Sequence, residues 1–103
     1  MNWQEMYKEL NTARRLSDKG KKRAALGLLL KEAGIDPVSI RGYSHAVWEL
    51  EVVVRRHCAA EHGLAHGQKV ILDGQEKTVR AIDTAGYILL EGVRGAFHPF
   101  RFM

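Results

Sequence analysis

The spacing of apolar residues changes once along the chain, between Gly63 and Gly67. Before this joint, apolar residues recur every three or four positions, which is the period of a helix. After it, they form short runs separated by glycine-containing turns, a pattern typical of strands. The sequence therefore predicts a helical region over residues 1–63 and a β region over residues 67–103. Because the joint is short, we expect one compact body.

Three helices are expected in the first region, at residues 3–16, 21–33 and 44–62. Asn2 has a side chain suited to a helix N-cap, and Glu5 follows three positions later, as in a capping box. Gly34 and Gly63 are suited to ending the second and third helices. The run Val52-Val53-Val54 would also suit a strand, but so long a periodic segment favours a helix.

The β region is expected to consist of short antiparallel strands. Asp73-Gly74 lies between two apolar runs and is a strong hairpin signal. A second turn is expected within residues 83–86, followed by a strand near 87–90. A final strand is expected near 96–102, with Pro99 at an edge or a bulge, because proline has no N–H to donate.

Residues 67–102 resemble the small SH3-like barrels, including the KOW and Tudor-like types. The resemblance rests on a short strand, the hairpin "LDGQEKTVRAID", the turn in "DTAGYILLEG" and a closing strand. It implies a barrel of four or five strands, so the expected fold is α+β, with the three-helix segment packed against the barrel. The ending "LEGVRGAFHPFRF" is similar to small accessory proteins of plasmids, phages and other mobile elements. Such barrels bind RNA, DNA, peptides or proteins, so the partner stays open.

The charge of the chain is concentrated near its N-terminus. The formal net charge is +4. Residues 1–25 hold seven Lys and Arg against three Asp and Glu, whereas the rest of the chain is balanced. Such an asymmetry indicates an acidic partner, and nucleic acid is the first candidate.

Basic residues flank the joint between the first two helices and are candidate phosphate contacts, together with two arginines of the β region. These nucleic-acid-binding candidates are Arg14, Arg15, Lys19, Lys21, Lys22, Arg23, Arg94 and Arg101. The competing interpretation is a solvated surface that keeps the protein in solution. The second helix has the apolar middle "AALGLLLKEAG", which disfavours a helix-turn-helix that reads base edges.

Aromatic residues of the β region are candidates for partner binding. In the expected final strand, alternation directs Phe100 and Phe102 inward, because the other set of side chains includes Arg101. Tyr87 and Phe97 would then be partly exposed beside arginines, as a stacking surface for bases or as a protein interface. The alternative function is therefore a protein–protein adaptor or inhibitor that binds a host factor through the barrel.

Histidines gather around the single cysteine and invite a metal-site interpretation. His57, Cys58, His62 and His66 are close in sequence, but Gly63 is expected to end the helix between the last two histidines. A histidine-rich helix end explains this pattern without a metal, and Cys58 is expected in the core. No catalytic motif accompanies these residues, so we expect no enzyme activity, metal or cofactor.

Length and composition limit the remaining classes. One cysteine excludes an internal disulfide, and no stretch approaches the ~20 apolar residues of a membrane span. No apolar signal segment is found, so the cytoplasm is the expected compartment. A chain of 103 residues buries only a small core, and a homodimer would be one way to add buried area.

Overall fold

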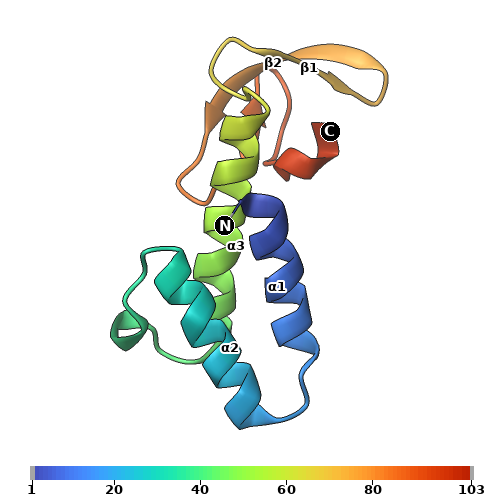
Figure 1. The fold of residues 1–103 in the computed structure, drawn as a ribbon. Helices are drawn as coiled ribbons and strands as arrows, with labels where there is room; N and C mark the ends of the chain where they lie inside the picture. The colour runs from blue at the N-terminus through green and yellow to red at the C-terminus, as the bar shows by residue number, and fades with distance from the viewer. Residues whose placement is uncertain (1, 103) are drawn as a thin grey trace. The chain divides into compact units, whose positions relative to one another are not determined.

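Three α-helices precede a small antiparallel sheet in the computed structural model, which describes residues 2–102 (Figure 1). The chain divides into two units, Met1–Val54 and Arg55–Met103, which we call the helical unit and the sheet unit. Met1 and Met103, the outermost residues of the two predicted regions, lie outside the described residues. Within the described residues, no helix is both long and apolar enough to cross a membrane.

The predicted three helices are confirmed. They are α1 (Trp3–Arg15), α2 (Lys19–Glu32) and α3 (Tyr43–Glu61), and a short 3-10 helix, η1 (Pro37–Ser39), precedes α3. Asn2 caps α1, because its side chain accepts a hydrogen bond from the Glu5 N–H at 2.9 Å. Asp18 caps α2 in the same way through the Lys21 N–H, also at 2.9 Å.

Apolar side chains at helical intervals form the core of the helical unit. The buried residues are Trp3, Met6, Leu10 and Ala13 of α1, Leu26, Leu29 and Leu30 of α2, and Ala46, Val47, Leu50, Val52 and Val54 of α3. Trp48 of α3 is not part of this core and keeps 46% of its surface exposed. The division between the units falls within α3, whose last residues belong to the sheet unit.

The sheet unit contains a three-stranded antiparallel sheet in the order β1-β2-β3. The strands are β1 (Lys69–Leu72), β2 (Gln75–Ile82) and β3 (Ile88–Leu90). Asp73 and Gly74 connect β1 to β2 with φ values of 50° and 81°, as a type I′ turn requires, so the predicted hairpin is confirmed. The core of this unit consists of Ala59, Leu64, Val70, Val79, Ile88 and Leu90.

The predicted closed barrel of four or five strands is wrong, because the sheet is open and has three strands. Of the described residues that follow β3, only Phe97 pairs with the sheet, through two backbone hydrogen bonds with Ile88 of 2.8 and 2.9 Å. Pro99 then begins the 3-10 helix η2 (Pro99–Phe102) in place of the expected strand. Proline cannot donate to a strand ladder, and its fixed φ suits the first position of a helical turn. The overall α+β class is confirmed.

Candidate functional site

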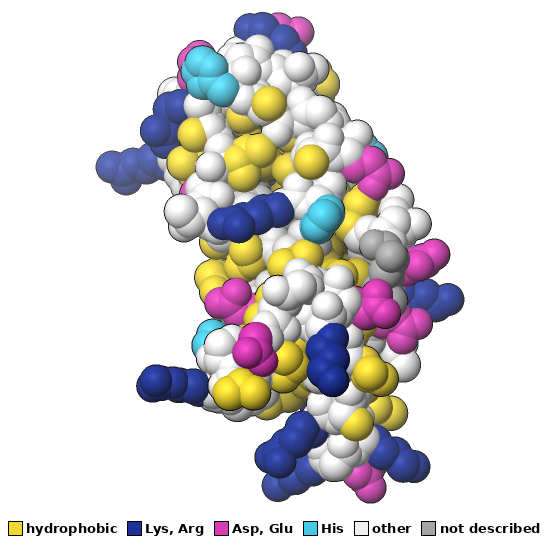
Figure 2. Space-filling model, turned by 60° about the vertical axis from the view of Figure 1, so that its left-hand side comes forward, with side chains coloured by type: hydrophobic (Ala, Val, Ile, Leu, Met, Phe, Trp, Pro, Cys, Tyr) yellow, Lys and Arg dark blue, Asp and Glu magenta, His cyan; other side chains and the backbone are white. Residues whose placement is uncertain are grey.

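The turn between α1 and α2 is the most basic part of the helical unit. Helix α1 ends at Arg15 and α2 begins at Lys19, so basic residues from both helices meet at a short connection. Asp18 is the one acidic residue between positions 14 and 23. Figure 2 shows Lys and Arg side chains gathered at the lower end of the view, the end at which Figure 1 shows this turn.

The basic side chains of this turn differ in whether another side chain contacts their charged group. Arg14 donates to the Glu51 carboxylate at 3.1 Å, and the Lys22 ammonium lies 4.9 Å from the centre of the Tyr43 ring. The remaining four are exposed and have no ion-pair partner among residues 2–102; they are Arg15, Lys19, Lys21 and Arg23. We call these four residues the basic turn. It presents positive charge that the described protein residues do not neutralise.

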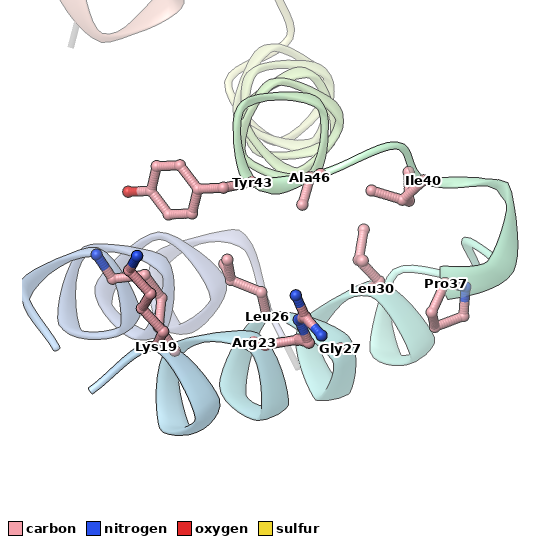
Figure 3. Close-up of a pocket in the computed structure, with 11 residues that line it drawn as sticks. Lys19, Arg23, Leu26, Gly27, Leu30, Pro37, Ile40, Tyr43 and Ala46 are labelled. Atoms are coloured by element: carbon pink, nitrogen blue, oxygen red, sulfur yellow. The ribbon is translucent and has the colours of Figure 1, made fainter. Parts of the chain in front are cut away.

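A groove of about 600 Å³ adjoins the basic turn. One wall is α2, and the other is the segment from η1 to the first turn of α3 (Figure 3). The lining combines cationic and apolar side chains, namely Lys19, Lys22 and Arg23 with Leu26, Leu30, Pro37, Ile40 and Ala46. Lys19 lies at one end, and Arg23 lies beside Gly27 (Figure 3). Sequence reasoning missed this groove, because its walls come from segments that are separate in the chain.

The two arginines predicted in the β region have different surroundings. Arg101 lies 3.3 Å from the Asp73 carboxylate, and its guanidinium is 5.5 Å from the centre of the Phe97 ring. Arg94 is exposed in the segment after β3 and has no ion-pair partner among the described residues. Arg94 therefore presents a full charge to solvent, whereas Asp73 offsets part of the charge of Arg101.

Tyr87 and Phe97, the predicted partner-binding aromatics, do not share one surface. Phe97 pairs with Ile88 and packs against the core of the sheet unit. Side chains alternate along a strand, so Tyr87 and His98 lie on the opposite face, with ring centres 6.4 Å apart. Both predicted aromatics are half-buried, and the Arg55 guanidinium lies 4.2 Å from the centre of the Tyr87 ring.

The expected inward pair, Phe100 and Phe102, is half-buried rather than fully buried. Phe102 packs against the core and lies 6.1 Å from Phe97, ring centre to ring centre. Phe100 instead lies 4.2 Å from the ring of His98. Strand alternation does not apply here, because these residues belong to a 3-10 helix and their side chains are not directed to two opposite faces.

Arg55 is a buried residue whose role sequence reasoning missed. Only 2% of its surface is exposed, and its Nε donates to the Ala85 carbonyl at 2.8 Å. Its neighbour Arg56 donates to the Thr84 carbonyl. The two arginines thereby hold the turn between β2 and β3 against the end of α3, where Gly86 lies close to their backbone. The one local sign of this contact in the sequence is Gly86, at the end of the turn "DTAG".

The residues considered for a metal site are not brought together. Among residues 2–102, no group of three or more His, Cys, Asp or Glu side chains is placed to hold a metal ion. His57 and His66 are exposed, whereas Cys58 is fully buried. Burial, and to a lesser extent the negative charge of Glu61, raises the pKa of the Cys58 thiol from 9.0 to about 11.

The Cys58 thiol should react slowly with thiol reagents in the native protein. Only the thiolate is nucleophilic, and a pKa of about 11 in place of 9.0 lowers the thiolate fraction at pH 8 about a hundredfold.

The native state binds the proton of the Cys58 thiol more tightly than the unfolded state does. Its contribution to stability is therefore complete below pH 9 and is lost as pH rises from 9 to about 11. The rate at which a thiol reagent labels Cys58, with and without urea, measures the difference in reactivity between the native and unfolded states. Fast labelling of the native protein at pH 8 would contradict the raised pKa.

The sequence matches no protein-family model, and comparison with curated proteins and with solved structures found no match. The fold and the candidate site define a small α+β protein with a basic turn and an adjoining groove.

Proposed function

We propose that the protein is a non-catalytic nucleic-acid-binding protein that contacts phosphates through the basic turn. The observation that carries this proposal is the exposure of four cationic side chains around one helix–helix connection, without carboxylate partners among residues 2–102. Cations of this kind bind a phosphate backbone by releasing its counterions. Lys22 and Arg14 border the same turn, and Arg94 and Arg101 of the sheet unit are predicted further contacts.

The arrangement favours binding that does not depend on base sequence. Helix α2 turns an apolar stripe toward the core, and four of its five basic residues lie in its first five positions, with Lys31 near its other end. Lys and Arg at a helix end can reach phosphates, whereas reading base edges needs polar side chains along a helix that enters the groove. The protein is therefore expected to bind nucleic acids of different sequence with similar affinity, as an accessory protein would.

Removing three charges of the basic turn should weaken nucleic-acid binding. The change is Lys19→Gln, Lys21→Gln and Arg23→Gln in one protein. Each lost phosphate contact is expected to lower the slope of log affinity against log salt by about one, so the slope should fall by about three. Binding at low salt should weaken at least ~10-fold. Fluorescence anisotropy with a labelled oligonucleotide, measured over a salt series, gives both values.

A matched variant controls for net charge. Lys8→Gln, Lys31→Gln and Arg80→Gln remove the same charge from exposed positions outside the basic turn. This control should keep most of the affinity and most of the salt slope. Equal losses in the two variants would show that only the overall charge matters. No binding by the unaltered protein at low salt would exclude the proposed function.

A further inference from the structure

The groove beside the basic turn has the length of a short helix. It runs along α2 from Lys19 to Leu30. With a rise of 1.5 Å per residue, that distance is about 16 Å, or three helical turns. Its opposite wall is formed by residues 37–46 (Figure 3). A helix of about 11 residues would therefore match the groove from end to end.

Gly27 lies in the groove, in the middle of α2, and internal packing does not require a glycine there. A glycine inside a helix is destabilising relative to alanine. A Cβ atom built at Gly27 would meet no atom within 4 Å, so alanine would fit the protein itself. A residue without a side chain allows the backbone of another element to approach closely. An occupant that packs on this part of α2 would account for the glycine.

The charges of the groove select a particular kind of occupant. Lys19 lies at one end, and Arg23 reaches along the groove to a place beside Gly27 (Figure 3), whereas most of the other lining residues are aliphatic. The complementary helix carries carboxylates at one end and an apolar stripe along the side that it buries. Helix-in-groove complexes of this type use apolar anchors at positions i, i+3 or i+4, and i+7. Opposite charges at the rim add orientation and speed of association.

Exposed apolar side chains next to the groove favour a protein partner over a small ligand. Val38, beside the lining residue Pro37, keeps 91% of its surface exposed, and Tyr43 at the cationic end keeps 45%. A partner protein extends beyond the groove and can cover exposed apolar side chains such as these, as interfaces with an apolar centre do.

We propose that this groove binds an acidic amphipathic helix of a partner protein. The surface is distinct in kind from the basic turn, because it adds an aliphatic lining to the cations. The two surfaces share Lys19 and Arg23, so an acidic helix would compete with a nucleic acid for the same charges, a consequence that rests on the proposed function. The groove would therefore allow the partner to release the protein from nucleic acid.

The test is selection from a random library of displayed peptides of about 11 residues or more, with the full-length protein as target. Selected peptides should combine Asp or Glu at one end with Leu, Ile or Phe at helical spacing. Their affinity should fall at least ~10-fold in Gly27→Leu, because the new side chain occupies the place of an apolar anchor. Ala24→Leu adds the same side chain to an exposed position of α2 outside the groove and should leave the affinity unchanged.

Two further measurements separate this proposal from nucleic-acid binding and from misfolding. Gly27→Leu should retain the unfolding midpoint of the unaltered protein or exceed it, and should bind an oligonucleotide with unchanged affinity. Lys19→Glu with Arg23→Glu should weaken the selected peptides and strengthen versions in which Lys replaces their acidic residues. Failure to enrich peptides, enrichment without acidic residues, or equal affinity of Gly27→Leu and Ala24→Leu would each overturn the proposal.

Discussion

Replacing Gly86 with alanine should lower the free energy of unfolding of the sheet unit by about 3 kcal/mol. Gly86 has a φ of 84°, in the left-handed region that side chains disfavour. A Cβ atom there would lie 2.8 Å from the Arg55 Cβ and 3.1 Å from the Arg56 backbone nitrogen, distances at which something must move. The turn would have to retreat from α3, and the hydrogen bond of Arg55 to Ala85 would lengthen or break.

A substitution at a second glycine distinguishes the effect of the close contact with Arg55 from the effect of the positive φ. Gly92 has a φ of 70°, but a Cβ atom at that position would meet nothing within 4 Å. Gly92→Ala should therefore cost only the conformational term, about 1 kcal/mol. Hydrogen exchange of the backbone amides of β2 and β3 measures the stability of the sheet unit directly. Similar protection of these amides in Gly86→Ala and Gly92→Ala would show that the close contact of Gly86 with Arg55 and Arg56 adds nothing to the loss of stability.

Arg55→Ala should be comparably damaging, with a loss of about 3 kcal/mol of stability in the sheet unit. The substitution leaves the part-buried Ala85 carbonyl without its charged donor, and a hydrogen bond from a charged group contributes about 1.5–3 kcal/mol. It also removes the guanidinium from the face of the Tyr87 ring, and the stem that packs beneath the turn. The same hydrogen-exchange measurement applies, and signals of residues 83–87 should change most.

Arg56 provides the matched control for Arg55. It is the next residue of α3 and also donates to the turn, through the Thr84 carbonyl, but its side chain is exposed. Exposed polar contacts contribute little, so Arg56→Ala should cost below ~1 kcal/mol. Equal effects of the two alanine substitutions would mean that burial of Arg55 does not decide the stability of the turn.

Local features of the fold were predictable because they depend on residues close in sequence. The cap formed by Asn2 and the turn formed by Asp73-Gly74 each involve a few consecutive positions, and both are confirmed. The ends of α2 and α3 are equally local: the N–H groups of Ile35 and Leu64 donate back to Leu30 and Ala59 at 2.8 and 2.9 Å.

The expected final strand failed for a reason that was also present in the sequence. Pro99 was interpreted as an edge or bulge residue, whereas it begins a 3-10 helix and ends the pairing with β3 after Phe97. Both outcomes satisfy the absence of a proline N–H. The choice between them depends on whether a further strand is available to pair, and that is a property of the assembled sheet.

The candidate site also combines a feature that the sequence predicts with features that depend on the folded structure. The basic turn could be predicted, because its charges flank a helix–helix connection only a few residues long. The groove could not, because α2 and the segment 37–46 meet only after folding. The burial of Arg55 could not be predicted either, since the carbonyl that it binds is 30 positions further along the chain.

The sequence by itself determined the three helices, the Asn2 cap of α1, the ends of α2 and α3, the hairpin and the positive charge at the α1–α2 turn. Each of these follows from hydrogen bonds, backbone preferences or charges within a few residues. Only the tertiary structure decided that the sheet stays open with three strands, that a groove adjoins the basic turn and that Arg55 is buried. Each of these depends on which distant segments pack together, and residue spacing along a single chain does not specify that choice.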